Sequence, residues 1–241
     1  MNDRMKKLIL ASGSPRRKEL LSLYTTDFEI HVSDFDESAV TADTPARLVE
    51  KLARGKCLAV SARHPGDLVL GCDTVVDVNG EVFGKPHSVE DAKRMLRALS
   101  GATHQVHTGV CVSDGAQTKS FVDSCRVTFF PISEEEIERY TATKEPYDKA
   151  GAYAIQGRAA LWLDRIEGDY YTIMGLPVSR TVRLIEQFWC TENEKLPKKL
   201  DKTLEKTASC GYNSSVLFCD GQPDGISPGL PCVLGIELER I

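Results

Sequence analysis

Three positively charged residues follow a loop of small residues near the start of the chain. The segment Ser12-Gly13-Ser14-Pro15-Arg16-Arg17-Lys18 comes directly after an apolar run. A loop leading from a buried strand into a helix directs backbone N–H groups and the positive end of the helix dipole toward an anion. A guanidinium adds two parallel hydrogen bonds to phosphate oxygens. The segment is a candidate phosphate site. The alternative is a capped surface helix with solvated basic residues.

An acidic residue interrupts the most hydrophobic part of the chain. Asp73 and Thr74 lie within the apolar segment 68–78. Burying a carboxylate is costly unless it accepts hydrogen bonds, binds a metal or reaches a cleft. Asp73 is therefore a candidate for activating a water or holding a divalent ion. An Asp that only bonds backbone amides at a strand end is the alternative.

Further candidates lie in acidic, basic and glycine-rich segments. Asp34, Asp36 and Glu37 supply the oxygen ligands that Mg²⁺ prefers, although most acidic loops are simply solvated. Gln156, in the glycine-rich segment 145–157, has an amide that both donates and accepts, as a base edge requires. A tight loop is the alternative there. Lys56 and Lys85 complete the candidates, against the simpler interpretation of surface lysines.

Hydrophobic periodicity and turn residues predict the elements that carry these side chains. Strands are expected over residues 8–11, 28–32, 68–78, 106–113, 117–130 and 160–166. Helices are expected over 15–24, 45–62, 88–101, 133–141 and 177–189. Asn79-Gly80 predicts a type I′ hairpin, and Ser133 with Glu136 predicts a capping box. Hairpins mixed with strand–helix alternation indicate an α/β fold with a mixed sheet.

Composition narrows the class of protein. The 241 residues are 41% hydrophobic and 27% charged, which is typical of a soluble globular protein. Neither a signal peptide nor a membrane span is recognisable, so we expect a cytoplasmic protein without membrane contact. The net charge of -5 disfavours nucleic acid as a partner. The eight cysteines form no C-x-x-C pair, and buried free thiols are expected at Cys72, Cys111 and Cys190 rather than disulfides.

The amino-acid composition changes near the C-terminus of the chain. We predict one domain over residues 1–192 and a C-terminal extension over 193–241, which is rich in Gly, Pro and Ser and carries three cysteines. A redox or metal-sensing role for this extension is one alternative to its being dispensable.

In order, the motifs resemble those of the Maf family of nucleotide pyrophosphatases. The matching segments span about residues 6–190 and read LASGSPRRKELL, LGCDTVV, GKP, LSG…H…TGV, EPYDKAGAYAIQG and GLP. The resemblance implies a mixed, twisted sheet flanked by helices with a deep cleft, as in inosine triphosphatases, and a homodimer. It implies hydrolysis of a nucleoside triphosphate to the monophosphate and pyrophosphate with a divalent metal, Mg²⁺ or Mn²⁺.

The same resemblance assigns roles to individual residues. Asp73 would be the general base, and Glu37 with Asp73 would hold the metal. Phosphate contacts would come from Ser12, Arg16, Arg17, Lys56 and Lys85. One departure is Gly55, where the family more often has Glu.

Three residues are similar to the family branch that acts on dTTP and UTP, namely Arg16, Thr74 and Gln156. We therefore expect dTTP and UTP as substrates, with modified pyrimidine triphosphates as possible extras. Two alternatives remain: a pyrophosphatase of the 7-methyl-GTP type, and a nucleotide-binding regulator of septum formation without turnover.

Overall fold

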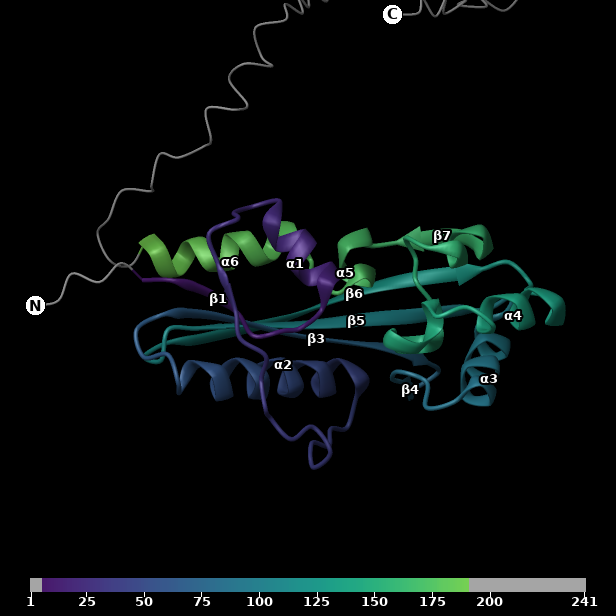
Figure 1. The fold of residues 1–241 in the computed structure, drawn as a ribbon, viewed down its shortest axis with the longest axis horizontal. Helices are drawn as coiled ribbons and strands as arrows, with labels where there is room; N and C mark the ends of the chain where they lie inside the picture. The colour runs from purple at the N-terminus through teal and green to yellow at the C-terminus, as the bar shows by residue number, and fades with distance from the viewer. Residues whose placement is uncertain (1–5, 191–241) are drawn as a thin grey trace, which may run out of the picture. The chain divides into compact units, whose positions relative to one another are not determined.

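A seven-stranded mixed sheet forms the centre of residues 6–190, the part of the chain that the computed structural model describes (Figure 1). The strand order is β2-β1-β3-β5-β6-β7, and β4 pairs with β3 outside this path. β1 is parallel to β2 and β3, whereas the remaining pairs are antiparallel. The strands are β1 (Leu8–Leu10), β2 (Glu29–Ile30), β3 (Leu68–Val78), β4 (Glu81–Phe83), β5 (Thr103–Ser113), β6 (Thr118–Phe129) and β7 (Leu163–Glu167). The predicted mixed α/β fold is confirmed. The boundary after residue 192 and the extension 193–241 lie outside the described residues.

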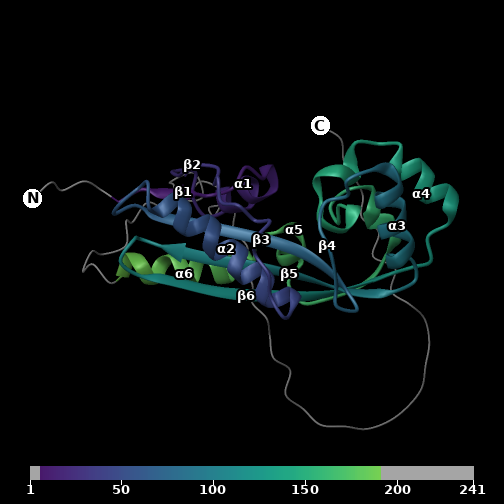
Figure 2. The ribbon, with the colours of Figure 1, turned by 90° about the horizontal axis from the view of Figure 1, so that it is seen from below.

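Helices cover both faces of this sheet. α2 crosses one face, whereas α1 and α6 lie on the other, and α3 and α4 lie beside the far end of the long strands (Figures 1 and 2). The helices are α1 (Pro15–Ser22), α2 (Pro45–Ser61), α3 (Val89–Leu99), α4 (Glu134–Thr141), α5 (Tyr170–Met174) and α6 (Val178–Cys190). Three 3₁₀ turns, η1 (Glu145–Asp148), η2 (Ala150–Ala152) and η3 (Arg158–Trp162), connect α4 to β7.

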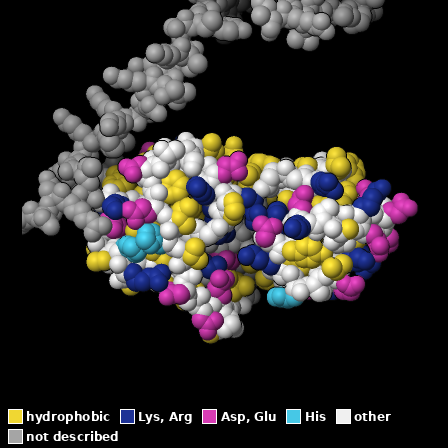
Figure 3. Space-filling view, in the orientation of Figure 1, with side chains coloured by type: hydrophobic (Ala, Val, Ile, Leu, Met, Phe, Trp, Pro, Cys, Tyr) yellow, Lys and Arg dark blue, Asp and Glu magenta, His cyan; other side chains and the backbone are white. Residues whose placement is uncertain are grey.

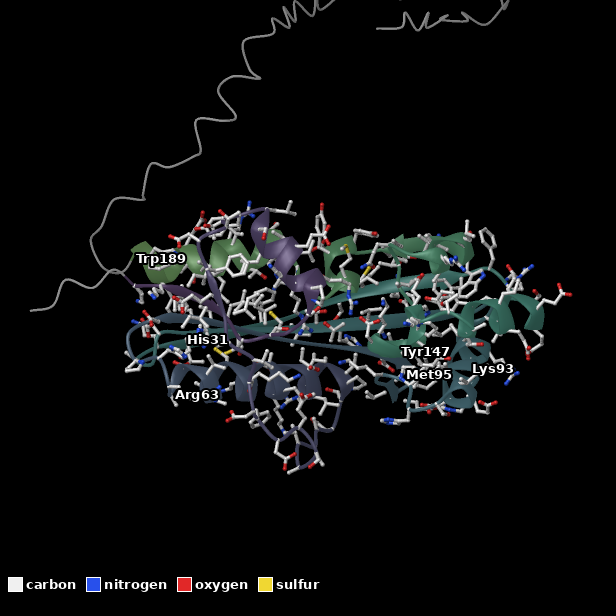
Figure 4. All side chains as sticks on the ribbon, in the orientation of Figure 1. His31, Arg63, Lys93, Met95, Tyr147 and Trp189 are labelled. Carbon is white, nitrogen blue, oxygen red and sulfur yellow. The ribbon has the colours of Figure 1, made fainter. Side chains whose placement is uncertain are left out.

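The long strands β3, β5 and β6 pass through more than one apolar cluster. At one end, side chains of β1, β3 and β5 pack against α6 on one face and α2 on the other. At the other end, α3, α4 and the 3₁₀ turns enclose a cluster that includes Met95 and the partly buried Tyr147 (Figure 4). Asp73 lies between these clusters, near the middle of β3.

Local sequence signals placed several of these elements correctly. β3 spans the predicted residues 68–78. Asn79 and Gly80 have φ of 53° and 91°, as a type I′ turn requires. The capping box is present, because Ser133 accepts from the backbone N–H of Glu136 while the Glu136 carboxylate accepts in return.

Other elements differ from the prediction. Ser14 precedes α1, as expected, but its side chain makes no capping hydrogen bond. Residues 160–162, expected in a strand, belong to the 3₁₀ turn η3, so β7 begins at Leu163. The five-residue helix α5 was not predicted, because one helical turn is too short to show an apolar period.

Cysteine burial follows the expectation for free thiols. Cys57, Cys72, Cys111 and Cys125 are free and buried, whereas the side chain of Cys190 lies outside the described residues. Among the described helices, none has the length and apolar character needed to cross a bilayer.

The buried His104 is expected to make stability depend on pH. Burial lowers the pKa of His104 to about 4, and its Nδ1 has no partner among the described residues. Between about pH 6.5 and 4 the unfolded chain therefore holds a proton that the folded chain lacks, so the unfolding free energy falls as pH falls, by at most about 3 kcal/mol. Urea denaturation at several pH values should show a flatter dependence in His104→Gln. The exposed His87 supplies the control, His87→Gln, which should keep the wild-type dependence.

Candidate active site

Strand β3 has an open stretch on the edge that faces away from β5. On that edge β1 pairs with Leu68–Leu70 and β4 pairs with Val76–Val78. Residues 71–75 between them have no partner among the described strands on this edge, and Asp73 lies at the centre of the stretch. Successive side chains of a strand point to opposite faces. The side chain of Asp73 accordingly points toward α2, and the side chain of Thr74 points toward the opposite face of the sheet, where Arg17 lies.

Asp73 shares an ammonium group with a second carboxylate. Lys56 Nζ lies 2.7 Å from Asp73 Oδ1 and 2.9 Å from Glu37 Oε2. Asp73 and Lys56 are largely buried, whereas Glu37 is about half exposed, with 52% of its side chain accessible. Burial raises the pKa of Asp73, opposed by the positive charges of Lys56 and Arg17. The result is a carboxylate of enhanced basicity that opposite charges keep ionisable.

The close approach of α2 to the sheet positions Lys56. Gly71 on β3 lies directly under the helix, where a Cβ would be 2.5 Å from the carbonyl oxygen of Ala53. The loop that carries Glu37 is held in a similar way, because the ring of Phe35 packs on the bare backbone of Gly55. The Gly at this position thus has a packing partner that the sequence did not indicate.

Arg17 is fixed by three acceptors around the loop that follows β1. Its Nε donates to the Gly175 carbonyl oxygen at 2.9 Å and its Nη1 to Ser12 Oγ at 3.0 Å. Its Nη2 donates to Thr74 Oγ1 at 3.1 Å. Three predicted site residues, Ser12, Arg17 and Thr74, therefore form one hydrogen-bonded group beside Asp73.

Arg16 connects the N-terminal loop to the glycine-rich segment 145–157. Its Nη1 lies 3.1 Å from Asp148 Oδ2. Partial burial opposes ionisation of Asp148, yet Lys149 and Arg16 together hold the pKa of this carboxyl below its ordinary value. Arg16 and Lys56 are thus both paired with protein carboxylates.

Lys85 and Gln156 are exposed, and neither makes a hydrogen bond or ion pair within the part of the chain that the structure describes. A backbone hydrogen bond from Gly151 to the carbonyl oxygen of Gly84 ties the segment of Lys85 to that of Asp148. In the space-filling view, Lys and Arg side chains gather near the middle of one face with Asp and Glu among them (Figure 3).

The structure therefore assembles most of the predicted site, in two adjoining groups. Glu37, Lys56 and Asp73 form one, and Ser12, Arg17 and Thr74 form the other. Sequence reasoning missed Gly175 as a partner of Arg17, and it missed Thr108, whose hydroxyl lies 2.9 Å from that of Thr74. The motif that contains Thr108 was recognised in the sequence, but nothing in the sequence indicated that Thr108 contacts Thr74.

Comparison with known proteins finds a family model, curated relatives and solved structures that match this chain. The family model described as Maf-like protein matches residues 7–188. A dTTP/UTP pyrophosphatase of Bacillus cytotoxicus is 49% identical over 184 residues, 76% of this chain and 96% of the relative. The protein of the same name from Bacillus mycoides is 48% identical over the same shares. Among solved structures, the Staphylococcus aureus Ham1 protein aligns with 78% of this chain and 100% of its own, at 16% identity and a TM-score of 0.46.

Gly71→Ala is expected to destabilise the fold, because the new Cβ would also lie 2.7 Å from the backbone nitrogen of Cys57 and push α2 away from the sheet. We expect a loss of about 1–3 kcal/mol in the unfolding free energy, measured by urea denaturation. Gly84→Ala is the matched control, since a Cβ there meets nothing within 4 Å. Equal stability of the two variants would contradict the close helix–strand contact.

Proposed function

Because this chain belongs to the Maf family, we propose that it is a nucleoside triphosphate pyrophosphatase that hydrolyses dTTP and UTP to the monophosphate and pyrophosphate. The relatives named dTTP/UTP pyrophosphatase support this substrate class. The observation that carries the proposal is the environment of Asp73. This ionisable side chain is largely buried between Lys56 and Arg17, on a stretch of the central strand whose outer edge no described strand pairs with.

Asp73 is suited to act as general base. A base works best when its pKa is close to the operating pH, so the raised pKa of this carboxyl favours proton transfer from water. Lys56 stabilises the ionised form through its hydrogen bond to Oδ1. In the proposed reaction, Asp73 orients a water molecule toward a phosphorus atom and accepts its proton at a carboxylate oxygen. The water oxygen then attacks that phosphorus, and pyrophosphate leaves.

Positive charge beside Asp73 would neutralise the phosphates. Arg17 and the loop at Ser12 lie on one side of the carboxylate, and Lys56 touches it from the other. Leaving pyrophosphate gains negative charge as the bond breaks, and fixed donors that meet this charge stabilise the transition state. Arg16 and Lys85 would complete the set, with Arg16 exchanging Asp148 for substrate.

The residues present fit a divalent cation such as Mg²⁺ or Mn²⁺. Glu37 and Asp73 would hold it, because their oxygens converge on the same point, now taken by Lys56 Nζ. Among the described residues, no group of three or more His, Cys, Asp or Glu side chains could hold a metal ion. Magnesium commonly binds through one or two carboxylates together with substrate phosphates. When bound, the ion would supply charge neutralisation for the phosphate oxygens.

Base selection is proposed for Arg16, Thr74 and Gln156. The exposed amide of Gln156 is free to pair with a base edge. On the family resemblance we also propose a homodimer in the cytoplasm, with no nucleic acid partner.

Asp73→Asn is expected to lower the rate of pyrophosphate release from dTTP by about 10²–10⁴-fold, the usual contribution of a general base. Nucleotide binding should survive, because the amide keeps the shape of the side chain. Asp77→Asn is the matched control, since Asp77 lies on the same strand and is 9% exposed against 8% for Asp73. Wild-type protein that binds dTTP but releases no pyrophosphate with either metal would instead support the regulator.

A comparison of dTTP, UTP and 7-methyl-GTP tests the substrate branch. We expect higher kcat/KM for the two pyrimidine nucleotides, and loss of turnover when a chelator removes the divalent metal. A clear preference for 7-methyl-GTP would contradict the assignment of Arg16, Thr74 and Gln156.

A further inference from the structure

A row of hydroxyl groups runs across the sheet behind Arg17. Thr74 on β3 faces Thr108 on β5 as its register partner, and their Oγ1 atoms lie 2.9 Å apart. Thr108 is fully buried, and its Oγ1 donates to the carbonyl oxygen of Thr172 in α5 at 2.8 Å. The row of hydrogen bonds therefore runs from Arg17 through Thr74 on β3 and Thr108 on β5 to α5.

The direction of every hydrogen bond in this row is fixed by its two ends. The guanidinium of Arg17 can only donate, and the carbonyl oxygen of Thr172 can only accept. Thr108 donates its single hydroxyl proton to that carbonyl, so its oxygen must accept the hydrogen bond from Thr74. Thr74 in turn donates its hydroxyl proton to Thr108 and accepts a hydrogen bond from Arg17. Only one arrangement of protons satisfies all members.

This arrangement determines what Arg17 can offer a ligand. A guanidinium has five N–H groups. Three are used by Gly175, Ser12 and Thr74. One N–H remains on each terminal nitrogen, so Arg17 keeps two donors for a ligand.

We propose that Thr108 is a positioning residue for triphosphate binding, which acts by fixing the hydroxyl of Thr74 as an acceptor and thereby the orientation of Arg17. The inference rests on the proposed function for the identity of the ligand. Thr108 is buried behind Thr74 and does not itself touch the phosphates. Without its hydroxyl, the proton of Thr74 loses its acceptor and becomes free to rotate toward Arg17, which would break the hydrogen bond from Nη2.

The test uses the full chain with inorganic tripolyphosphate as the probe and calorimetry as the measurement, so that no turnover is needed. Thr108→Val replaces the hydroxyl by a methyl group of similar size and is expected to weaken binding about tenfold, roughly the value of one hydrogen bond. Thr108→Ser keeps the hydroxyl and should bind within about twofold of wild type. Thr108→Ala, which also lacks the hydroxyl but adds no bulk, should resemble Thr108→Val and replaces it if that variant does not fold.

A matched control comes from the same strand. Thr103 on β5 has its Oγ1 2.9 Å from that of Thr128 on β6, in an exposed pair far along the strand from Arg17. Thr103→Val should leave tripolyphosphate binding unchanged. A loss equal to that of Thr108→Val would mean that any such change in β5 acts through the fold, and the proposal would be wrong.

A double-mutant cycle separates positioning from general loss of packing. If Thr108 acts through Arg17, then Thr108→Val should cause no further loss in an Arg17→Ala background. Unchanged binding in Thr108→Val, an equal loss in Thr108→Ser, or a full second loss in the Arg17→Ala background would each overturn the proposal. Failure of wild type to release pyrophosphate would refute the proposed function alone, because tripolyphosphate binding is measured without turnover.

Discussion

The carboxylate of Asp73 lies in the middle of an otherwise apolar strand, where an ionised group is stable only if charges of opposite sign lie close by. Lys56 and Arg17 meet this requirement from opposite faces of the sheet. Both cations need supports of their own, since long basic side chains do not hold one position unaided. Glu37 supports Lys56, and the carbonyl of Gly175 with two hydroxyls supports Arg17. Much of the site can be understood as compensation for one buried charge.

This compensation depends on how closely backbone segments approach each other. Gly71 allows α2 to lie against β3, and only then does Lys56 reach Asp73. Gly175 ends α5 with a φ of 105°, and a Cβ there would lie 3.2 Å from Thr74 Oγ1. Among the described strands, none pairs with residues 71–75 on the edge of β3 that faces away from β5, which leaves room there between β1 and β4. The chain thus uses missing side chains and a missing strand partner to make room for a polar site.

Sequence signals predicted local structure well and spatial partners less well. The bounds of β3 and the turn at Asn79 follow from patterns within about ten residues, where propensity and turn chemistry act. The partnership of Thr74 with Thr108 depends instead on the register of two strands, and no local pattern specifies that register. The contact of Gly55 with Phe35 was not predicted for a similar reason, because Phe35 lies in a loop. Motifs indicated candidate residues, whereas only the fold shows which of them touch.

Asp73 and Thr74 are neighbours in the chain but serve opposite faces of one strand. Their division of labour depends on the parity of position along β3, which places even-numbered and odd-numbered residues on different sides. Volume-conserving replacement of an apolar residue in this strand disturbs the site less than gain or loss of one residue does. A single-residue slip would turn the carboxylate toward Arg17 and the hydroxyl toward Lys56, exchanging the two halves of the site in one step. The number of residues in this strand therefore matters more to the site than which apolar residues flank Asp73.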